Sequence, residues 1–181
     1  MRLRTVILLL ASLLLLGLTS VSAAAALALA APIHAGQQLF DVQAWAEHRY
    51  EALLGTPDGR AQFGLTLLER RIDDLEWSLA TPYEWDALRE ISLEIDHAVQ
   101  LFANTGVEDE AEIRAVFLDH MDRLLALLDR ASYLPEAAPL ILAEFRAQAL
   151  GLRDRAAEGS VPLGELAAGW DIQVKELPAA G

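Results

Sequence analysis

Four side chains that can bind a cation recur at helical spacing in the middle of the chain. Three carboxylates lie four residues apart and a histidine follows the last of them, which gives the series Asp86, Glu90, Glu94 and His97. Like charges at a spacing of four destabilise a helix unless a cation or a basic side chain compensates them. These four residues, here called the acidic ridge, are the candidate metal site of the sequence. The simpler interpretation, which the sequence favours, is a solvated acidic face neutralised by arginines.

The end of the acidic ridge has the spacing of a ligand pair in metal-binding bundles. Glu94 and His97 match the Glu-x-x-His motif of di-iron helical bundles, but that chemistry needs a second such motif on another helix. The stretch that ends at His120 lacks the glutamate. His34 and His48 have no second ligand at a useful spacing along the chain. The sequence therefore predicts no complete metal centre and no cofactor.

His120 lies on the apolar side of its own helix, between Phe117 and Leu124. A buried imidazole needs a hydrogen-bond partner, and Gln148 on the apolar side of a later helix is the candidate. We therefore predict that His120 is a buried structural residue and not a metal ligand.

The sequence contains no catalytic signature. It has neither a Gly-x-Ser-x-Gly nucleophile motif nor a glycine-rich phosphate loop. Cysteine is absent, which excludes disulfides and thiol chemistry. Pairs of carboxylates decide nothing, because 27 acidic residues produce them by chance. We expect a protein that is not an enzyme.

The charge of the chain limits its partners. The formal net charge is -13, and leaving out Arg2 and Arg4 at the N-terminus brings the remainder to -15. Nucleic acid and anionic lipid headgroups both require basic patches. We therefore expect no nucleic-acid partner.

An uncharged run rich in leucine and alanine, residues 5–31, follows Arg2 and Arg4. About 20 apolar residues suffice to cross a bilayer as a helix, and flanking basic residues stay on the cytoplasmic side. The run therefore predicts a membrane anchor that places the rest of the chain outside the cytoplasm. Residues 6–18 also have the length of a signal-peptide apolar region, and residues 21–23 are small enough for cleavage. A secreted or periplasmic protein, released after signal cleavage, is the alternative.

The elements that must position the candidate side chains are helices. Apolar residues recur in steps of three and four from residue 39 to residue 158, interrupted by Gly, Pro, Asn and Thr clusters. This pattern predicts helices at residues 39–54, 60–80, 82–103, 108–131 and 135–158. We therefore expect an all-α fold, an antiparallel bundle of about five helices. The expected domains are the anchor or signal segment at 1–31, the bundle at 32–158 and a tail at 159–181.

The tryptophans are candidates for contact with a protein partner. Trp77 and Trp85 flank the corner at Thr81 and Pro82, and aromatic residues are enriched at interfaces. The other interpretation, which the sequence slightly favours, is that they close the end of the bundle. Trp170, in the tail, is expected to dock onto the bundle.

Two stretches resemble a known family. The first is Gly-Gln-Gln-Leu-Phe-Asp-Val at 36–42 with Glu47 after it, and the second runs from Pro57 through Arg60-Ala61 to Glu-Arg-Arg-Ile at 69–72. They are similar to motifs of a bacterial extracytoplasmic helical domain of unknown function, which follows a single membrane helix in anti-sigma-factor-like proteins. Gln37 stands where that family has aspartate. The resemblance implies a helical domain outside the cytoplasm.

These features predict a non-enzymatic, membrane-anchored extracytoplasmic helical binding module. We expect it to be an accessory or sensory partner of a protein in an envelope or membrane complex. The alternative is a divalent-cation-responsive helical protein that uses the acidic ridge.

Overall fold

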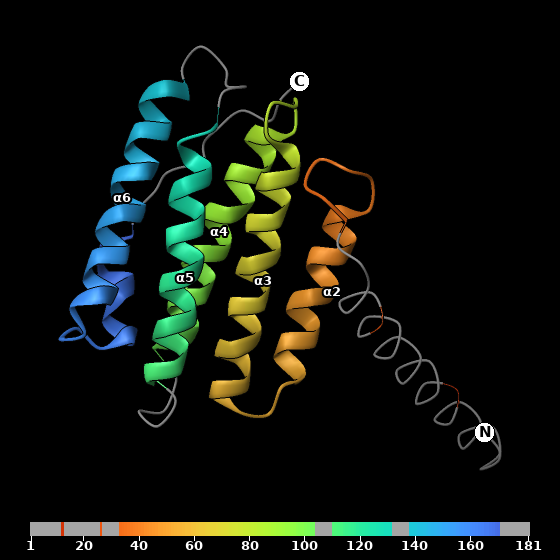
Figure 1. The fold of residues 1–181 in the computed structure, drawn as a ribbon. Coiled ribbons are helices and arrows are strands. Elements are labelled where there is room, and N and C mark those ends of the chain that lie inside the picture. The colour runs from red at the N-terminus through yellow and green to blue at the C-terminus, as the bar shows by residue number, and fades with distance from the viewer. Residues whose placement is uncertain (1–11, 13–25, 27–32, 104–109, 132–137, 171–181) are drawn as a thin grey trace.

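The computed structural model describes residues 33–103, 110–131 and 138–170, together with Ser12 and Ala26. Its described part is an all-helical bundle without strands, and successive helices run antiparallel (Figure 1). The helices are α2 (Phe40–Leu53), α3 (Pro57–Ser78), α4 (Glu84–Phe102), α5 (Glu110–Leu128) and α6 (Ala138–Glu158), followed by the short 3-10 helix η1 (Leu163–Gly169). The predicted all-α bundle is confirmed, and each of the five predicted helices has a counterpart.

Local sequence signals set the ends of α3. Thr56 caps its N-terminus, because the Thr56 hydroxyl accepts a hydrogen bond from the amide of Gly59 at 3.2 Å, and Pro57 occupies the first turn. The helix therefore begins three residues earlier than predicted. At its other end Ala80 adopts a left-handed φ of 62°, and its amide donates to Glu84 Oε2 at 2.7 Å. This contact joins the end of α3 to the start of α4.

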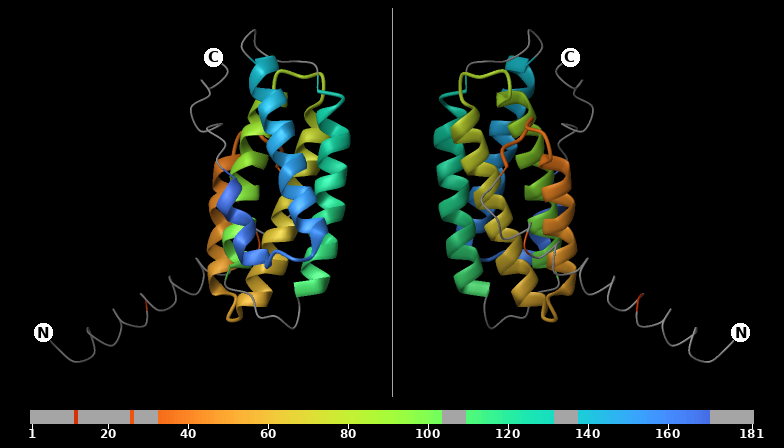
Figure 2. Two further views of the ribbon diagram at one scale, coloured as in Figure 1. Left: turned by 90° about the vertical axis from the view of Figure 1, so that its left-hand side faces the viewer. Right: turned by 90° about the vertical axis from the view of Figure 1, so that its right-hand side faces the viewer.

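The core lies where α3 packs against α4 and α5 and where α6 covers α5 (Figure 2). Its largest fully buried side chains include Phe102 of α4 and Phe117 of α5, whose ring centroids are 5.3 Å apart. Helix η1 packs against α4 and α6. The structure therefore places the first part of the predicted tail within the bundle, since Leu163, Leu166 and Trp170 are buried there.

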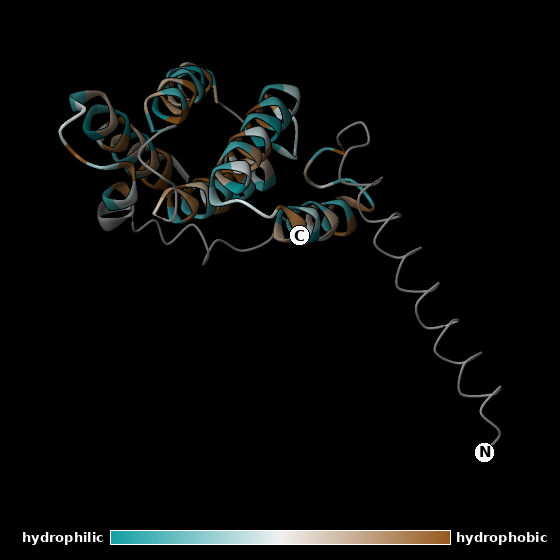
Figure 3. Ribbon diagram, turned by 90° about the horizontal axis from the view of Figure 1, so that it is seen from below, coloured by the Kyte–Doolittle hydropathy of each residue, from teal (hydrophilic) through white to brown (hydrophobic). Residues whose placement is uncertain are grey.

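Helix α2 lies at the edge of the bundle and packs mainly on α3 (Figures 1 and 3). Its buried residues are mostly polar: Phe40, Gln43, Ala46, Glu47 and Glu51. This composition distinguishes α2 from α4, whose buried residues are mostly apolar. The buried polar and charged side chains of α2 therefore lie where this helix meets the rest of the bundle.

No helix within the described ranges is long and apolar enough to cross a membrane. The predicted anchor or signal segment at 1–31 falls outside the described residues, apart from Ser12 and Ala26.

His120 is buried, at 8% exposed, as predicted. Its hydrogen bond is made with the backbone of Leu65 in α3, whereas the sequence suggested Gln148. Gln148 instead donates to Glu144 Oε1 at 3.4 Å within α6. Burial lowers the pKa of His120, which favours the neutral imidazole expected of a structural residue.

The two tryptophans at the α3 to α4 corner have different environments. Trp85 is 5% exposed and belongs to the core, whereas Trp77 is 44% exposed. Trp77 stacks on His34 with ring centroids 4.3 Å apart, and on its other neighbour Tyr83 at 6.2 Å. The proposed partner patch of Trp77 and Trp85 is therefore not a shared exposed surface, because Trp85 closes the bundle.

Candidate metal centre

A chain of ion pairs joins α2 to α3 inside the bundle. Glu47 accepts hydrogen bonds from Arg70, at 2.8 Å, and from Arg71. Arg71 also donates to Asp74 Oδ2 at 3.0 Å, and the other Asp74 oxygen lies 2.7 Å from His34 Nδ1. Glu47 and Arg71 belong to the two stretches that carry the family resemblance, so the fold brings these stretches into contact.

Arg71 is the cation at the centre of this chain. Burial lowers its pKa, but the carboxylates of Glu47, Glu94 and Asp74 outweigh burial and raise the pKa above its usual value. Arg71 is therefore a permanent positive charge under the interface between α2 and α4. Its guanidinium also lies over the ring of Phe40, 4.8 Å from the centroid.

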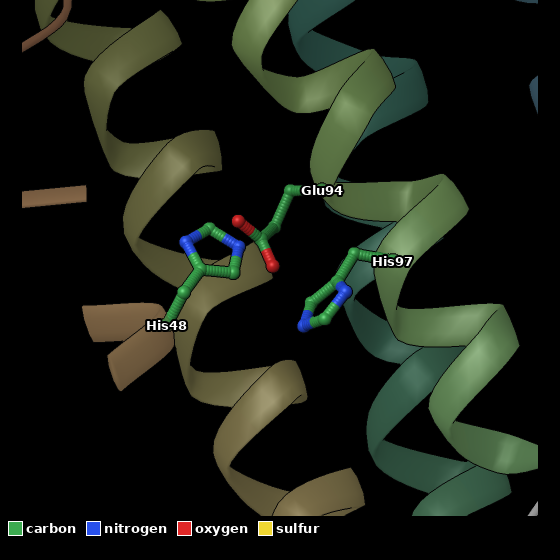
Figure 4. A group of neighbouring side chains, drawn as sticks. All are labelled: His48, Glu94 and His97. Atoms are coloured by element: carbon green, nitrogen blue, oxygen red, sulfur yellow. The ribbon is translucent and has the colours of Figure 1, made fainter. Parts of the chain in front are cut away.

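Three potential metal ligands gather beside this chain. His48 of α2 and Glu94 and His97 of α4 place one ligand atom each within 4.8 Å of one another (Figure 4). Two imidazoles and a carboxylate are a common donor set for Zn²⁺ and other divalent transition metals. Among the described residues this is the one group of three or more such side chains at this separation.

Both histidines have a partner that fixes the ring. His48 Nδ1 lies 2.8 Å from the carbonyl oxygen of Ala44. Because a carbonyl only accepts, Nδ1 carries the proton in the neutral ring, and Nε2 keeps its lone pair for a metal. His97 Nε2 lies 2.5 Å from Glu51 Oε2. Ligand histidines usually have such a carbonyl or carboxylate behind them, which fixes the tautomer and the ring orientation.

Glu94 is the least satisfied polar group of the site. It is 4% exposed, and its Oε1 atom has no hydrogen-bond partner. Burial raises the pKa of Glu94 and the carboxylate of Glu47 adds to this, while the neighbouring imidazoles and the guanidinium of Arg71 act in the opposite direction. A buried carboxylate oxygen without a donor is costly and rare in folded proteins. A bound cation is one way to satisfy it, because a metal ion replaces the missing donor.

The charges around the site favour a divalent cation. The carboxylates of the two adjoining clusters are Glu47, Glu51, Asp74 and Glu94, and their guanidinium partners are Arg70 and Arg71. With neutral histidines and ionised carboxylates, the negative charges exceed the positive ones by two. A divalent ion would balance this excess.

The structure divides the acidic ridge into two parts. Glu94 and His97 belong to the metal group, whereas Asp86 and Glu90 line a separate surface cavity beside Phe40. Glu90 is paired with Arg89 at 2.9 Å, as the interpretation of an arginine-neutralised face predicts. The reason is geometric: four residues advance a helix by about 40° beyond a full turn, so Asp86 and Glu94 point about 80° apart.

The contribution of α2 is not apparent from spacing along the chain. The partners of His48 are 46 and 49 residues later, on α4. A signal was present, since Gln43, Glu47 and Glu51 repeat every four residues and give α2 a polar side that must meet other polar groups. Placing that side against α4 requires the tertiary arrangement.

Comparison of the chain with protein-family models, with curated proteins and with solved structures finds no match. The resemblance based on residues 36–42 and 57–72 therefore stays a prediction.

Proposed function

We propose that this protein binds one divalent transition-metal ion, with Zn²⁺ as the representative, through His48, Glu94 and His97. The observation that carries the proposal is the Glu94 carboxylate, which is 4% exposed, has an oxygen without a hydrogen-bond partner and lies between two imidazoles. The sequence ranks cation binding second. The geometry supports cation binding, because His48 adds a ligand from a second helix to the Glu94 and His97 pair.

The donor set selects the class of metal. Ca²⁺ and Mg²⁺ prefer oxygen ligands, whereas imidazole nitrogen suits Zn²⁺, Cu²⁺, Ni²⁺ and Fe²⁺. Three protein ligands leave the fourth position of a tetrahedral ion for water, while Glu51 holds His97 from behind. We therefore expect micromolar Zn²⁺ to bind and millimolar Ca²⁺ and Mg²⁺ not to compete.

Binding requires a modest contraction of the site. Two ligands bound about 2.0 to 2.1 Å from a tetrahedral ion are separated by about 3.3 Å. The ligand atoms lie within 4.8 Å of one another without the ion, so closure by about 1.5 Å is enough. Rotation about the side-chain bonds of Glu94 and the two histidines can supply such a movement.

The module that we propose acts by binding, with no reaction assigned to the metal. Residues 5–31 and the two preceding arginines support a location anchored in the membrane with the bundle outside the cytoplasm, or a released protein after signal cleavage. In either setting the bundle would bind a divalent metal in the envelope, as a sensor or a buffer, and act as a partner of a membrane or envelope protein.

Isothermal titration of the full chain in a mild detergent tests the proposal. We expect one Zn²⁺ per chain, loss of binding in Glu94→Gln and in His48→Asn, and unchanged binding in the control Glu90→Gln. Glu90 has the same chemistry on the same helix but lies outside the metal group. Absence of saturable Zn²⁺ binding, or equal losses in Glu94→Gln and Glu90→Gln, would contradict the proposed function.

A further inference from the structure

Helix α2 has its apolar side facing outward. Its exposed side carries Val42, Trp45, Arg49 and Leu53 in steps of three and four, here called the outer stripe. Val42 is 47% exposed, Trp45 56% and Leu53 57%. A surface helix normally buries its apolar side and exposes its polar side. In α2 the polar residues Gln43 and Glu47 are buried instead.

The exposed apolar side chains are concentrated on this helix. Of the nine large hydrophobic side chains that are exposed within the described residues, four lie between positions 39 and 53. The fourth is Leu39, at the start of α2, which is 65% exposed. Exposed apolar residues that share one side of a helix are typical of a surface that another molecule covers.

We propose that the outer stripe pairs with the outer stripe of a second copy of this chain about a two-fold axis near Trp45. The charges of α2 are self-complementary about that point, because Asp41 precedes Trp45 by four residues and Arg49 follows it by four. Antiparallel pairing therefore places Asp41 of each copy opposite Arg49 of the other. The same axis brings Leu39 of each copy close to Leu53 of the other, offset by about 3 Å along the helix, because the midpoint of positions 39 and 53 is one residue from Trp45. A two-fold interface requires this reciprocal arrangement.

Trp45 and Arg49 are arranged for such an interface within one copy. The Arg49 guanidinium lies over the Trp45 ring, 5.6 Å from the centroid. This contact covers part of the indole and holds the guanidinium at the outer surface, where a carboxylate from the second copy can reach it. Tryptophan and arginine are the residue types that most often dominate binding energy at interfaces.

A lipid surface fits the outer stripe less well than a second copy. The chain carries a formal net charge of -13, and Asp41 borders the stripe, so anionic lipid headgroups repel it. A lipid also gives the Asp41 and Arg49 pattern no counterpart, whereas the two-fold arrangement satisfies both residues.

The expected dimer is weak on its own. Helix α2 has 14 residues and is about 21 Å long, so the contact falls at the small end of protein interfaces, where association is transient. Anchoring by residues 5–31 would raise the effective concentration of the outer stripes and favour pairing. The dimer proposal does not depend on metal binding.

Cysteine cross-linking tests the pairing directly, because the chain contains no cysteine of its own. In the double variant Leu39→Cys with Leu53→Cys, the two thiols of one chain are about 21 Å apart and cannot join each other. Two-fold pairing brings each close to the other type in the second copy. Mild oxidation of the full chain in its membrane or in detergent should therefore yield a covalent dimer. Neither single variant has a thiol opposite its own, so neither should dimerise.

Charge reversal in the double-cysteine background distinguishes specific pairing from collision. We expect Asp41→Arg or Arg49→Asp alone to reduce the covalent dimer and the two together to restore it. Val116→Cys, at a 39% exposed position of α5, is the collision control and should stay monomeric. The two-fold pairing would be overturned by dimers in the single variants, by equal dimers in the control or by insensitivity to charge reversal. Absence of any dimer, or cross-links to a different protein, would also overturn it. Circular dichroism verifies that each variant is folded.

Discussion

Replacing Glu94 with glutamine should change stability in opposite directions without and with metal. Glutamine is nearly isosteric with glutamate but neutral, so it removes the cost of a buried charge at a position that is 4% exposed. An unsatisfied buried polar group costs about 1 to 3 kcal/mol. The neutral amide also loses the attraction of Arg71 and adds a donor that needs a partner, which offsets part of the gain. We expect metal-free Glu94→Gln to be about 0 to 1 kcal/mol more stable than the wild type at pH 7.

The sign follows from the direction of the pKa shift. The pKa of Glu94 is raised in the folded protein, so the folded state binds more protons than the unfolded state over the range between the two pKa values. The contribution of Glu94 to stability is therefore fully present at low pH and is lost as pH rises through the folded pKa. Glutamine cannot lose a proton, so the variant avoids this loss.

Zinc should reverse the order of the two proteins. A ligand that binds only the folded form adds RT ln(1 + [L]/Kd), about 2.7 kcal/mol at a hundredfold excess over Kd. The wild type gains this amount and Glu94→Gln gains nothing, so the wild type becomes more stable by about 2 kcal/mol. For a chain of this size 1 kcal/mol corresponds to about 2 to 4 °C in Tm. The zinc-dependent rise in Tm of the wild type is then about 5 to 10 °C.

Thermal unfolding of the full chain in a mild detergent, followed by circular dichroism with EDTA or with Zn²⁺, measures both differences. Glu90→Gln is the control, because its partly exposed pair with Arg89 contributes less than about 1 kcal/mol and has no metal neighbour. A Glu94→Gln variant clearly less stable than the wild type in EDTA would contradict the predicted sign, because Glu94 would then have a structural partner. An equal rise in Tm with Zn²⁺ for both proteins would refute the metal site.

Four further predictions concern His120, Arg71 and the N-terminal segment. His120→Ala should lower the free energy of unfolding by about 1 to 3 kcal/mol and leave the zinc titration unchanged, since it removes a buried ring of α5 that is not part of the metal group. An unchanged Tm would count against its structural role. Burial lowers the pKa of His120 below 6.5 in the folded protein, so the stability that its neutral form contributes is present above pH 6.5 and is lost as pH falls below that value. His120→Gln should therefore make the free energy of unfolding less dependent on pH on the acid side. Arg71→Met should cost about 3 to 5 kcal/mol by urea unfolding, because it removes the buried cation between Glu47 and Asp74 and leaves them only Arg70 and His34. A cost below about 1 kcal/mol would mean that Arg70 and His34 are sufficient partners. Intact-mass measurement of the native protein should give the full chain if residues 5–31 are retained as an anchor, whereas a mass that begins near residue 24 would establish cleavage.

The helices could be predicted because each depends on neighbours in the sequence. In α3 the residues Ala61, Leu65, Leu68, Ile72 and Leu75 are spaced by three and four, and all are buried as that spacing requires. Thr56 and Pro57 show why the boundary was less certain, since both suit a turn as well as a helix start, and the hydrogen bond to Gly59 decides between them. Local chemistry was therefore sufficient for the fold class and insufficient for the exact ends.

Only part of the metal group could be predicted from the sequence, because its ligands come from two helices. Glu94 and His97 share a helix and have a recognisable spacing, so the sequence brings them together. His48 lies one residue after Glu47 of the polar side of α2, but that pattern does not say which helix the polar side meets. Its contact with α4 arises because α2 and α4 both pack on α3 with polar residues between them, which one sequence cannot reveal.

The reversed polarity of α2 connects the two proposals physically. Its inner side is held by buried charges such as the Glu47 and Arg71 pair, and such pairs add little net stability because desolvation offsets their attraction. A metal ion bound by His48 on α2 and by Glu94 and His97 on α4 would add a direct link between these helices. The ion would fix α2 in the position that presents the outer stripe to a second copy. Zinc should therefore increase the cross-linking of the Leu39→Cys, Leu53→Cys variant if both proposals hold, and Glu94→Gln should abolish that increase while leaving the basal dimer.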